Sequence, residues 1–310
     1  MRARYWLLTT ISTILISSAA IAGLNMMIDV YGLYRSTSGR RLHVLGDERV
    51  AKYLLSMRYV PQNFNALLSG ASISANWRVT AIDRLRVYNE SLNGATIIEE
   101  KALIQASLER PGISVVLLLV HPALTYSSEF RTIEMTPSLK RSALGSLSLW
   151  TAYKDMLNIR LGRLPQWFDY AGTETFLDGH HEMNIHMKKM WEAPEFNIDP
   201  AAWHAYMDLV AHLRARRIKI VFIVPPTSEQ LLSSKRPALV RYLQRVRSDV
   251  GPGDLWIDFM SPEHDDFSKT SANFSDGVHL TSDGARQVVS EINTTLNRWL
   301  DQRRLVIAEQ

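Results

Sequence analysis

Two polar runs in this 310-residue chain have the residue types of a nucleophile and its base. Ser72 follows Gly70-Ala71 just beyond an apolar stretch, and Asp276 precedes His279 by three positions near the C-terminus. A carboxylate can orient an imidazole, which then accepts the proton of a serine hydroxyl. Each run also has a plainer interpretation, because serine often caps helices and aspartate often forms turns. Taken together, the two runs predict a serine nucleophile activated by a histidine base.

Further candidate residues follow other predicted strands. Ligands of open parallel sheets bind beyond the carboxyl ends of the strands. Gly94 follows the second predicted strand and can bring its N–H toward the same pocket, although it also fits a simple turn. His121 follows the central strand and is either a pocket residue or a structural histidine. Asn76 and Asn93 lie close to these residues in the sequence and are candidate pocket residues.

The elements that position these residues alternate between strand and helix. We predict strands over 64–69, 85–88, 113–120, 218–224 and 255–259. We predict helices over 73–83, 94–110, 201–217, 228–250 and 282–300. The run ISVVLLLV over 113–120 is apolar on both faces and short, as in the centre of a parallel sheet. The alternation predicts a doubly wound α/β domain with a mainly parallel sheet of about five strands.

An aromatic-rich stretch over about 127–200 interrupts this alternation, and we interpret it as an insertion between strands. Its aromatic residues fit a satellite of the core or a platform for sugar rings: Trp150, Trp167, Phe168, Tyr170, Phe176, Trp191 and Phe196. Within it, His180, His181, Glu182 and His186 lack the spacing that places two histidines on one helix face. We therefore predict no metal site there, and no cofactor.

The N-terminus predicts a membrane segment. Arg2 and Arg4 precede an uncharged run from Tyr5 to Ile28, and such a run spans roughly 36 Å as a helix against a hydrocarbon core of about 30 Å. The arginines favour a cytoplasmic N-terminus. The alternative is a signal peptide, since small residues over 18–23 resemble a cleavage site. We expect an anchor over 1–30, a linker and lead-in segment over 31–60, and one domain over 61–310.

Composition excludes several classes of function. The chain has no cysteine, which excludes a disulfide scaffold, a thiolate metal site and a cysteine nucleophile. Lys and Arg exceed Asp and Glu by 35 − 31 = 4, and the pI is about 9.2. This charge is too small to indicate a nucleic-acid partner, so none is predicted.

The motifs resemble those of the SGNH hydrolase superfamily. Gly70-Ala71-Ser72 is similar to its first block, Gly94 to the glycine of its second, and the run from Asp276 to His279 to its last. The resemblance implies a flavodoxin-like sheet, catalysis by Ser72, His279 and Asp276, and an oxyanion hole formed by the N–H groups of Ser72 and Gly94. The third block departs from the family, because His121-Pro122 stands where an oxyanion-binding asparagine is expected. Either another donor, such as Asn76 or Asn93, substitutes, or the hole has two donors.

A second resemblance concerns the segment after the apolar run. The sequence DVYGLY over 29–34 is similar to the D-P-Y-G segment of membrane-anchored SGNH-like proteins that act in polysaccharide O-acetylation, as in alginate acetylation, or in teichoic acid D-alanylation. This resemblance implies a single-pass protein of the bacterial inner membrane with a periplasmic domain. It also implies a carbohydrate substrate and a multi-pass membrane acyltransferase as partner. The alternative is a catalytically silent scaffold or binding subunit of a complex that modifies or exports a polysaccharide.

Overall fold

A five-stranded parallel sheet forms the centre of the molecule. The computed structural model describes residues 2–129, 135–139, 147–175 and 185–303. Its strands follow the order β2-β1-β3-β4-β5, and every neighbouring pair is parallel. They are β1 (Ala66–Ser69), β2 (Val87–Asn89), β3 (Val115–Leu119), β4 (Lys219–Val224) and β5 (Leu255–Asp258). The predicted α/β class and strand number are confirmed.

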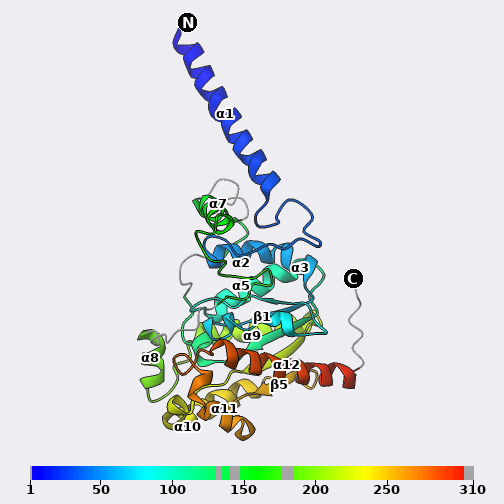
Figure 1. Cartoon of the computed structure of the whole chain (residues 1–310), viewed down its shortest axis with the longest axis vertical. Coiled ribbons are helices and arrows are strands. Elements are labelled where there is room, and N and C mark those ends of the chain that lie inside the picture. The colour runs from blue at the N-terminus through cyan, green and yellow to red at the C-terminus, as the bar shows by residue number, and fades with distance from the viewer. Residues whose placement is uncertain (1, 130–134, 140–146, 176–184, 304–310) are drawn as a thin grey trace.

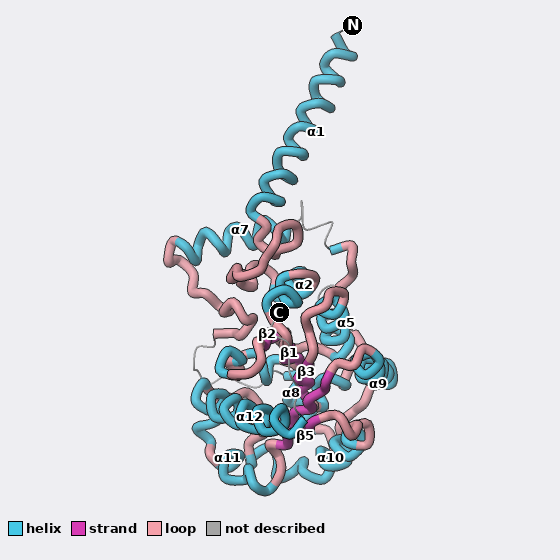
Figure 2. The backbone as a smooth tube through the Cα atoms, turned by 90° about the vertical axis from the view of Figure 1, so that its right-hand side faces the viewer, coloured by secondary structure: helices cyan, strands magenta, loops and turns pink. Residues whose placement is uncertain are grey.

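Helices cover both faces of this sheet (Figures 1 and 2). On one face α5 (Ile97–Leu108) packs against α9 (Pro200–Ala215). Beside α9 lies α10 (Glu229–Arg247), whose Arg245 stacks on Trp203 of α9. The opposite face carries α12 (Ser282–Arg303). Because all five strands are parallel, their carboxyl ends meet at one edge of the sheet.

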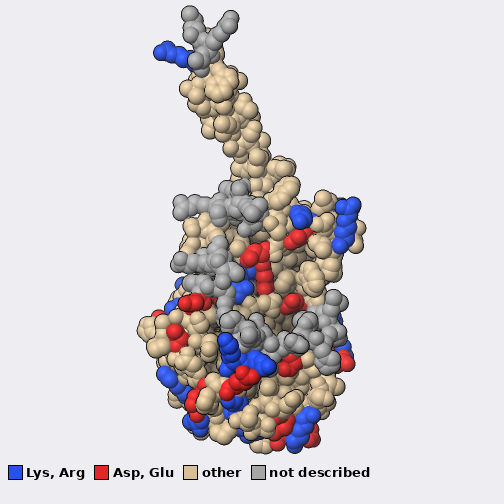
Figure 3. Space-filling model, turned by 90° about the vertical axis from the view of Figure 1, so that its left-hand side faces the viewer, with Lys and Arg blue, Asp and Glu red and all other residues tan. Residues whose placement is uncertain are grey.

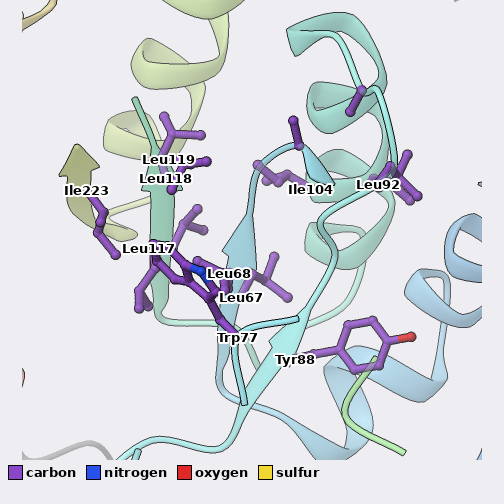
Figure 4. Close-up of a cluster of buried hydrophobic side chains, with 14 of the residues drawn as sticks. Leu67, Leu68, Trp77, Tyr88, Leu92, Ile104, Leu117, Leu118, Leu119 and Ile223 are labelled. Atoms are coloured by element: carbon purple, nitrogen blue, oxygen red, sulfur yellow. The ribbon is translucent and has the colours of Figure 1, made fainter. Parts of the chain in front are cut away.

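The core lies between these layers. All five side chains of β3 are buried, as expected for a central strand covered on both faces. Figure 4 shows Leu117, Leu118 and Leu119 of this strand close to the leucines of β1. Trp77 is fully buried beside them. This continuous apolar layer fixes the strand register that positions the loops at the strand ends.

Two helices precede β1 in the segment predicted to be a linker and lead-in. They are α2 (Glu48–Ser56) and α3 (Tyr59–Asn63). Asp47 caps α2 by accepting a hydrogen bond from the Val50 N–H at 3.0 Å. The buried faces of both helices join the main hydrophobic core, so this stretch is part of the folded body.

The helix predicted over 73–83 is wrong in its extent. The structure has one turn, α4 (Ser72–Ala75), followed by a 3-10 turn over Val79–Ala81. The Asn89 amide donates to the carbonyl oxygens of Ser74, Ala75 and Trp77 at 2.8 to 3.3 Å. The backbone then turns to bury Trp77 instead of continuing as a helix.

The insertion contains α7 (Leu147–Arg160) and α8 (Ile185–Glu192). Trp191 and Phe196 belong to the core, which was one of the two predicted environments, whereas Trp150 and Trp167 are exposed. The sugar platform stays a prediction. Phe176 lies outside the described residues, as do His180, His181 and Glu182.

The N-terminal helix α1 (Arg2–Ile28) projects from the domain (Figure 1). It is long and apolar enough to cross a membrane, a property that signal sequences share. Asp29 ends the helix with φ +50°. Its buried carboxylate accepts hydrogen bonds from the backbone N–H groups of Leu33, Tyr34 and Arg35 at 2.7 to 3.1 Å. These bonds tie the chain to the end of α1 at the point where it enters the domain.

Candidate active site

Ser72, His279 and Asp276 form a continuous hydrogen-bonded series. The Ser72 hydroxyl oxygen lies 2.8 Å from Nε2 of His279. On the other side of the ring, Nδ1 of His279 lies 2.6 Å from Oδ2 of Asp276. The fold thus brings together residues 207 positions apart in the sequence. This order of hydroxyl, imidazole and carboxylate is the arrangement that activates a serine.

The Asp276 carboxylate is held by its own loop. Its Oδ1 accepts hydrogen bonds from the backbone N–H groups of Val278, at 3.1 Å, and His279, at 2.8 Å. Burial opposes ionisation of Asp276, but its hydrogen bond and charge interaction with His279, together with these backbone bonds, lower its pKa below the usual value. An ionised Asp276 holds a proton on Nδ1 of His279, which leaves Nε2 to accept the proton of Ser72.

Close packing at the end of β1 positions Ser72. A Cβ on Gly70 would lie 2.5 Å from the Ser74 hydroxyl and 2.9 Å from the Cβ of Leu119, so only glycine fits. Ser72 is the first residue of α4, and the Asn89 amide holds the carbonyl groups of that turn. Asn89 is a positioning residue that the sequence analysis did not identify. Its place at the end of β2 is the signal that would have indicated it.

The loop that carries His279 is a closed turn before α12. Phe274 and Leu280 form an antiparallel bridge, and the Ser275 N–H donates to the His279 carbonyl at 2.9 Å. Gly277 adopts φ +94°, a conformation that glycine accepts readily. The Asn76 amide donates to the Leu280 carbonyl at 2.8 Å. Asn76 therefore links the loop of Ser72 to the loop of His279.

His121 lies at the same edge of the sheet. Ser69 of β1 pairs with Leu118 of β3. Ser72 and His121 each follow their paired residue by three positions, so both lie just beyond the carboxyl ends of these neighbouring strands. Nδ1 of His121 accepts a hydrogen bond from the Ala123 N–H at 3.2 Å, which places the proton of a neutral ring on Nε2. Burial, with a smaller contribution from His279, lowers the pKa of His121 to about 3. Its buried Nε2 has no hydrogen-bond partner among the described residues.

The other predicted residues lie on the loop after β2. The loops that follow β1 and β2 run side by side, because the Leu92 N–H donates to the Gly70 carbonyl at 3.1 Å. Gly94 adopts φ +66° two residues further on. The Asn93 amide donates to the carboxylates of Glu48 and Glu174, at 3.2 and 3.3 Å.

Glu174 is a residue of the insertion that the sequence analysis did not identify as part of this region. Its N–H donates to the Ala75 carbonyl at 2.8 Å, next to the Ser72 turn. Burial raises the pKa of Glu174, while the bond from Asn93 and the charge of His279 act to lower it. No motif in the sequence marks this residue, since the contact depends on how the insertion folds back.

A buried cluster of polar side chains contacts the loops that follow β1 and β2. Glu90 accepts hydrogen bonds from the hydroxyls of Ser56, at 2.8 Å, and Ser107. Lys52 is fully buried and donates to the Ser91 carbonyl. Ser91 in turn shares a hydrogen bond of 2.8 Å with Ser74, two residues from Ser72. Through these contacts the cluster helps to fix the turn of the candidate nucleophile.

Glu90 makes the stability of the fold depend on pH. Burial raises its pKa from 4.5 to about 7, although its hydrogen bonds and Lys52 act to lower it. Between these two pH values the folded chain retains a proton that the unfolded chain releases. The free energy of unfolding should therefore fall as the pH rises through this window. The shift corresponds to roughly 3 kcal/mol at about 1.4 kcal/mol per pKa unit.

We expect Glu90→Gln to remove the part of this pH dependence that Glu90 contributes, while the buried Glu100, whose pKa burial also raises, keeps its own. Glutamine keeps an oxygen that accepts from Ser56 and Ser107 but carries no charge at any pH. Denaturant unfolding of the two proteins, measured in steps from pH 4.5 to 8, should diverge as the pH rises, with the variant more stable at pH 8. The exposed Glu109 is the matched control, and Glu109→Gln should leave the slope as it is. A parallel pH profile for Glu90→Gln and the wild type would contradict the prediction.

A cavity of about 620 Å³ lies at the opposite edge of the sheet, beside the amino ends of β1 and β2. Arg40, Arg41 and Arg86 line part of it. It is separate from the Ser72 site, which lies at the carboxyl ends. Among the described residues, no group of three or more histidine or acidic side chains is arranged to hold a metal ion.

The fold defines an α/β protein with a parallel sheet and a serine–histidine–aspartate arrangement at its carboxyl edge. No family model and no curated protein sequence matches the chain. Solved structures similar to it include one assigned as a platelet activating factor from Streptococcus pneumonia, with a TM-score of 0.44 and 12% identity over 83% of this chain and 90% of that one. Another is an acetyl xylan esterase from the rumen bacterium Butyrivibrio proteoclasticus, with a TM-score of 0.34 and 8% identity over 76% and 64%. These scores are too low to support an inference about function, so the site is judged on its own geometry.

Proposed function

We propose that this protein is a membrane-anchored acyl-transfer enzyme of serine type that acts outside the cytoplasm on an exported polysaccharide. The observation that carries the proposal is the unbroken series from the Ser72 hydroxyl through His279 to Asp276. The lowered pKa of Asp276 supports it, since an ionised carboxylate keeps His279 in the tautomer that serves as a base.

In the proposed reaction, Ser72 Oγ attacks the carbonyl carbon of an acyl ester while Nε2 of His279 takes the hydroxyl proton. The bond from the carbonyl carbon to the leaving oxygen then breaks, and His279 returns the proton to that oxygen. A sugar hydroxyl or a water molecule attacks the acyl-serine in a second, equivalent step. Attack by the sugar hydroxyl gives transfer, whereas attack by water gives esterase activity.

The N–H groups of Ser72 and Gly94 are the proposed donors to the oxyanion. Asn76 and Asn93 are weaker candidates for a third donor, because their amides bind Leu280, Glu48 and Glu174. Nε2 of His121 is the remaining candidate at this edge, since it carries a proton and lacks a partner among the described residues. Such donors act by stabilising charge that develops on the carbonyl oxygen.

A direct test is to trap the acyl-enzyme. The full-length chain in detergent is mixed with an activated acetyl ester, quenched in acid and digested for mass spectrometry. We expect an acetyl group on the peptide that contains Ser72, and none on that peptide in His279→Ala. The same experiment repeated in cells that carry a multi-pass acyltransferase would identify the acyl donor. An unmodified Ser72 at every time point, with ester turnover unchanged in His279→Ala, would exclude the proposed chemistry.

The alternative function is a catalytically silent scaffold in a polysaccharide-modification complex. The observation in its favour is the exit of β3, where His121-Pro122 takes the place of the expected asparagine. A scaffold requires neither the hydroxyl of Ser72 nor the ring of His279. Polysaccharide acylation in cells should then survive Ser72→Ala, whereas the enzyme predicts its loss.

A further inference from the structure

Large apolar side chains are exposed on α7 and on the turn that follows it. Outside α1, every exposed large hydrophobic side chain among the described residues lies in this stretch, with the exception of Val240 on α10. We define the α7 patch as Trp150, Leu157 and Leu161, which are 54% to 67% exposed. Apolar surface concentrated in one place on a folded domain marks an interaction site.

The α7 patch lies on one side of the helix. Trp150 and Leu157 are seven positions apart in α7, and Leu161 directly follows the helix with its N–H bonded to the Leu157 carbonyl at 2.9 Å, so the three side chains lie along one face. On the inner side, Leu149 and Ala152 are buried in the core. Helix α7 is therefore anchored to the domain by one face and presents the other outward.

Helix α7 lies beside the end of α1. The hydroxyl of Tyr153 on α7 donates to Oδ1 of Asn25 at 2.9 Å, three residues before α1 ends. Figures 1 and 2 both show α7 next to the domain end of α1. Figure 3 shows the column of α1 without charged side chains below its N-terminal tip. A bilayer that surrounds this column would have its surface at the level of α7.

The charges around the α7 patch are mainly positive. Between positions 150 and 167 the chain carries Lys154, Arg160 and Arg163 against the single Asp155, which gives 3 − 1 = +2. The exposed Arg35 lies at the same level, because its guanidinium donates to the Met27 carbonyl of α1 at 2.8 Å. Tryptophan with lysine and arginine is the combination that favours the surface of an anionic membrane.

We propose that the α7 patch inserts into the headgroup region of the bilayer that α1 spans. The domain is then held at two points, α1 across the membrane and α7 in its surface. A lipid surface fits better than a protein partner, because the patch adjoins the end of the membrane span and its rim carries positive charge. The proposal rests on α1 spanning the membrane and does not depend on the chemistry of Ser72.

The absence of cysteine permits a direct measurement of depth. Single-cysteine variants of the full-length chain, Leu157→Cys, Ile14→Cys and Val240→Cys, are labelled with a nitroxide. Each is placed at one chain per nanodisc in phosphatidylethanolamine with phosphatidylglycerol. Electron paramagnetic resonance then compares collisions of the label with oxygen, which concentrates in lipid, and with a water-soluble nickel chelate. Val240 is the matched control, being an exposed apolar residue far along the chain from α7.

We expect the oxygen-to-nickel collision ratio at position 157 to approach that at position 14 and to exceed clearly that at position 240. Equal ratios at 157 and 240, with a lipid-like ratio at 14, would overturn insertion of the patch. Protection of position 157 that arises only after a second protein is added would overturn it as well, in favour of a protein interface. A water-exposed label at position 14 would refute the span, and with it the proposal. Since activity is not the readout, none of these results decides the acyl-transfer chemistry proposed for Ser72, although a water-exposed label at position 14 would also refute the membrane anchor of that proposal.

Discussion

Replacing Ser72 with alanine is expected to lower kcat for an activated acetyl ester by about 10⁴- to 10⁶-fold. The variant removes the hydroxyl oxygen that lies 2.8 Å from the candidate base, Nε2 of His279. What remains is binding and charge stabilisation without a covalent intermediate. Steady-state kinetics on the purified full-length chain, with burst-phase analysis, provide the measurement.

Ser74→Ala is the matched control for this loss. Ser74 lies in the same helical turn and its hydroxyl bonds Ser91, so its removal disturbs the local packing without touching the proposed nucleophile. We expect a much smaller fall in kcat for Ser74→Ala and an unchanged melting temperature for Ser72→Ala. If both variants lost activity equally, or if Ser72→Ala retained turnover, Ser72 would not be the nucleophile.

Replacing Asp276 with asparagine should reduce kcat by about 10⁴-fold while the loop stays closed. The asparagine carbonyl oxygen can still accept from the N–H groups of Val278 and His279. Its NH₂ group would then face Nδ1 of His279, which must become an acceptor. The ring proton moves to Nε2, and His279 no longer has a free lone pair to take the proton of Ser72.

The control for Asp276→Asn is Asp283→Asn, which makes the same charge change on the exposed first turn of α12. Its kcat should match that of the wild type. Chemical shifts of the His279 ring nitrogens, measured by NMR on selectively labelled protein, should show the exchange of tautomers in Asp276→Asn only. An unaltered tautomer together with wild-type kcat would remove Asp276 from the mechanism.

The layered fold could be predicted from the sequence because its strands show strong local patterns of apolar residues. The run at 113–120 is apolar at every position, and the structure buries β3 completely. The motifs around Ser72 and His279 could be found in the sequence for the same reason, because each lies directly beside a predicted strand or helix. Parallel strands then bring such loops to one edge of the sheet regardless of how far apart they lie in the chain.

Features that depend on long-range contacts could not be predicted from local sequence patterns. The short α4 turn is fixed by Asn89, whose amide replaces helical hydrogen bonds with bonds to a different strand. Glu174 approaches the site only because the insertion folds back onto Ala75. Helix α2 contains the fully buried Lys52, although lysine side chains normally lie exposed on the surface. Local periodicity carries no information about such partners.

The junction at Asp29 has a consequence for how the site meets its substrate. A domain on a flexible tether explores many positions, and the effective concentration at which it meets its target depends on the length of the tether. Here three backbone groups are bonded to the carboxylate of Asp29, and Tyr153 bonds Asn25 of α1. Such a joint holds the Ser72 site at a fixed height and orientation relative to α1. Under the proposed function a substrate would then have to be delivered to that site, and a longer, flexible joint would replace this fixed placement with a random search.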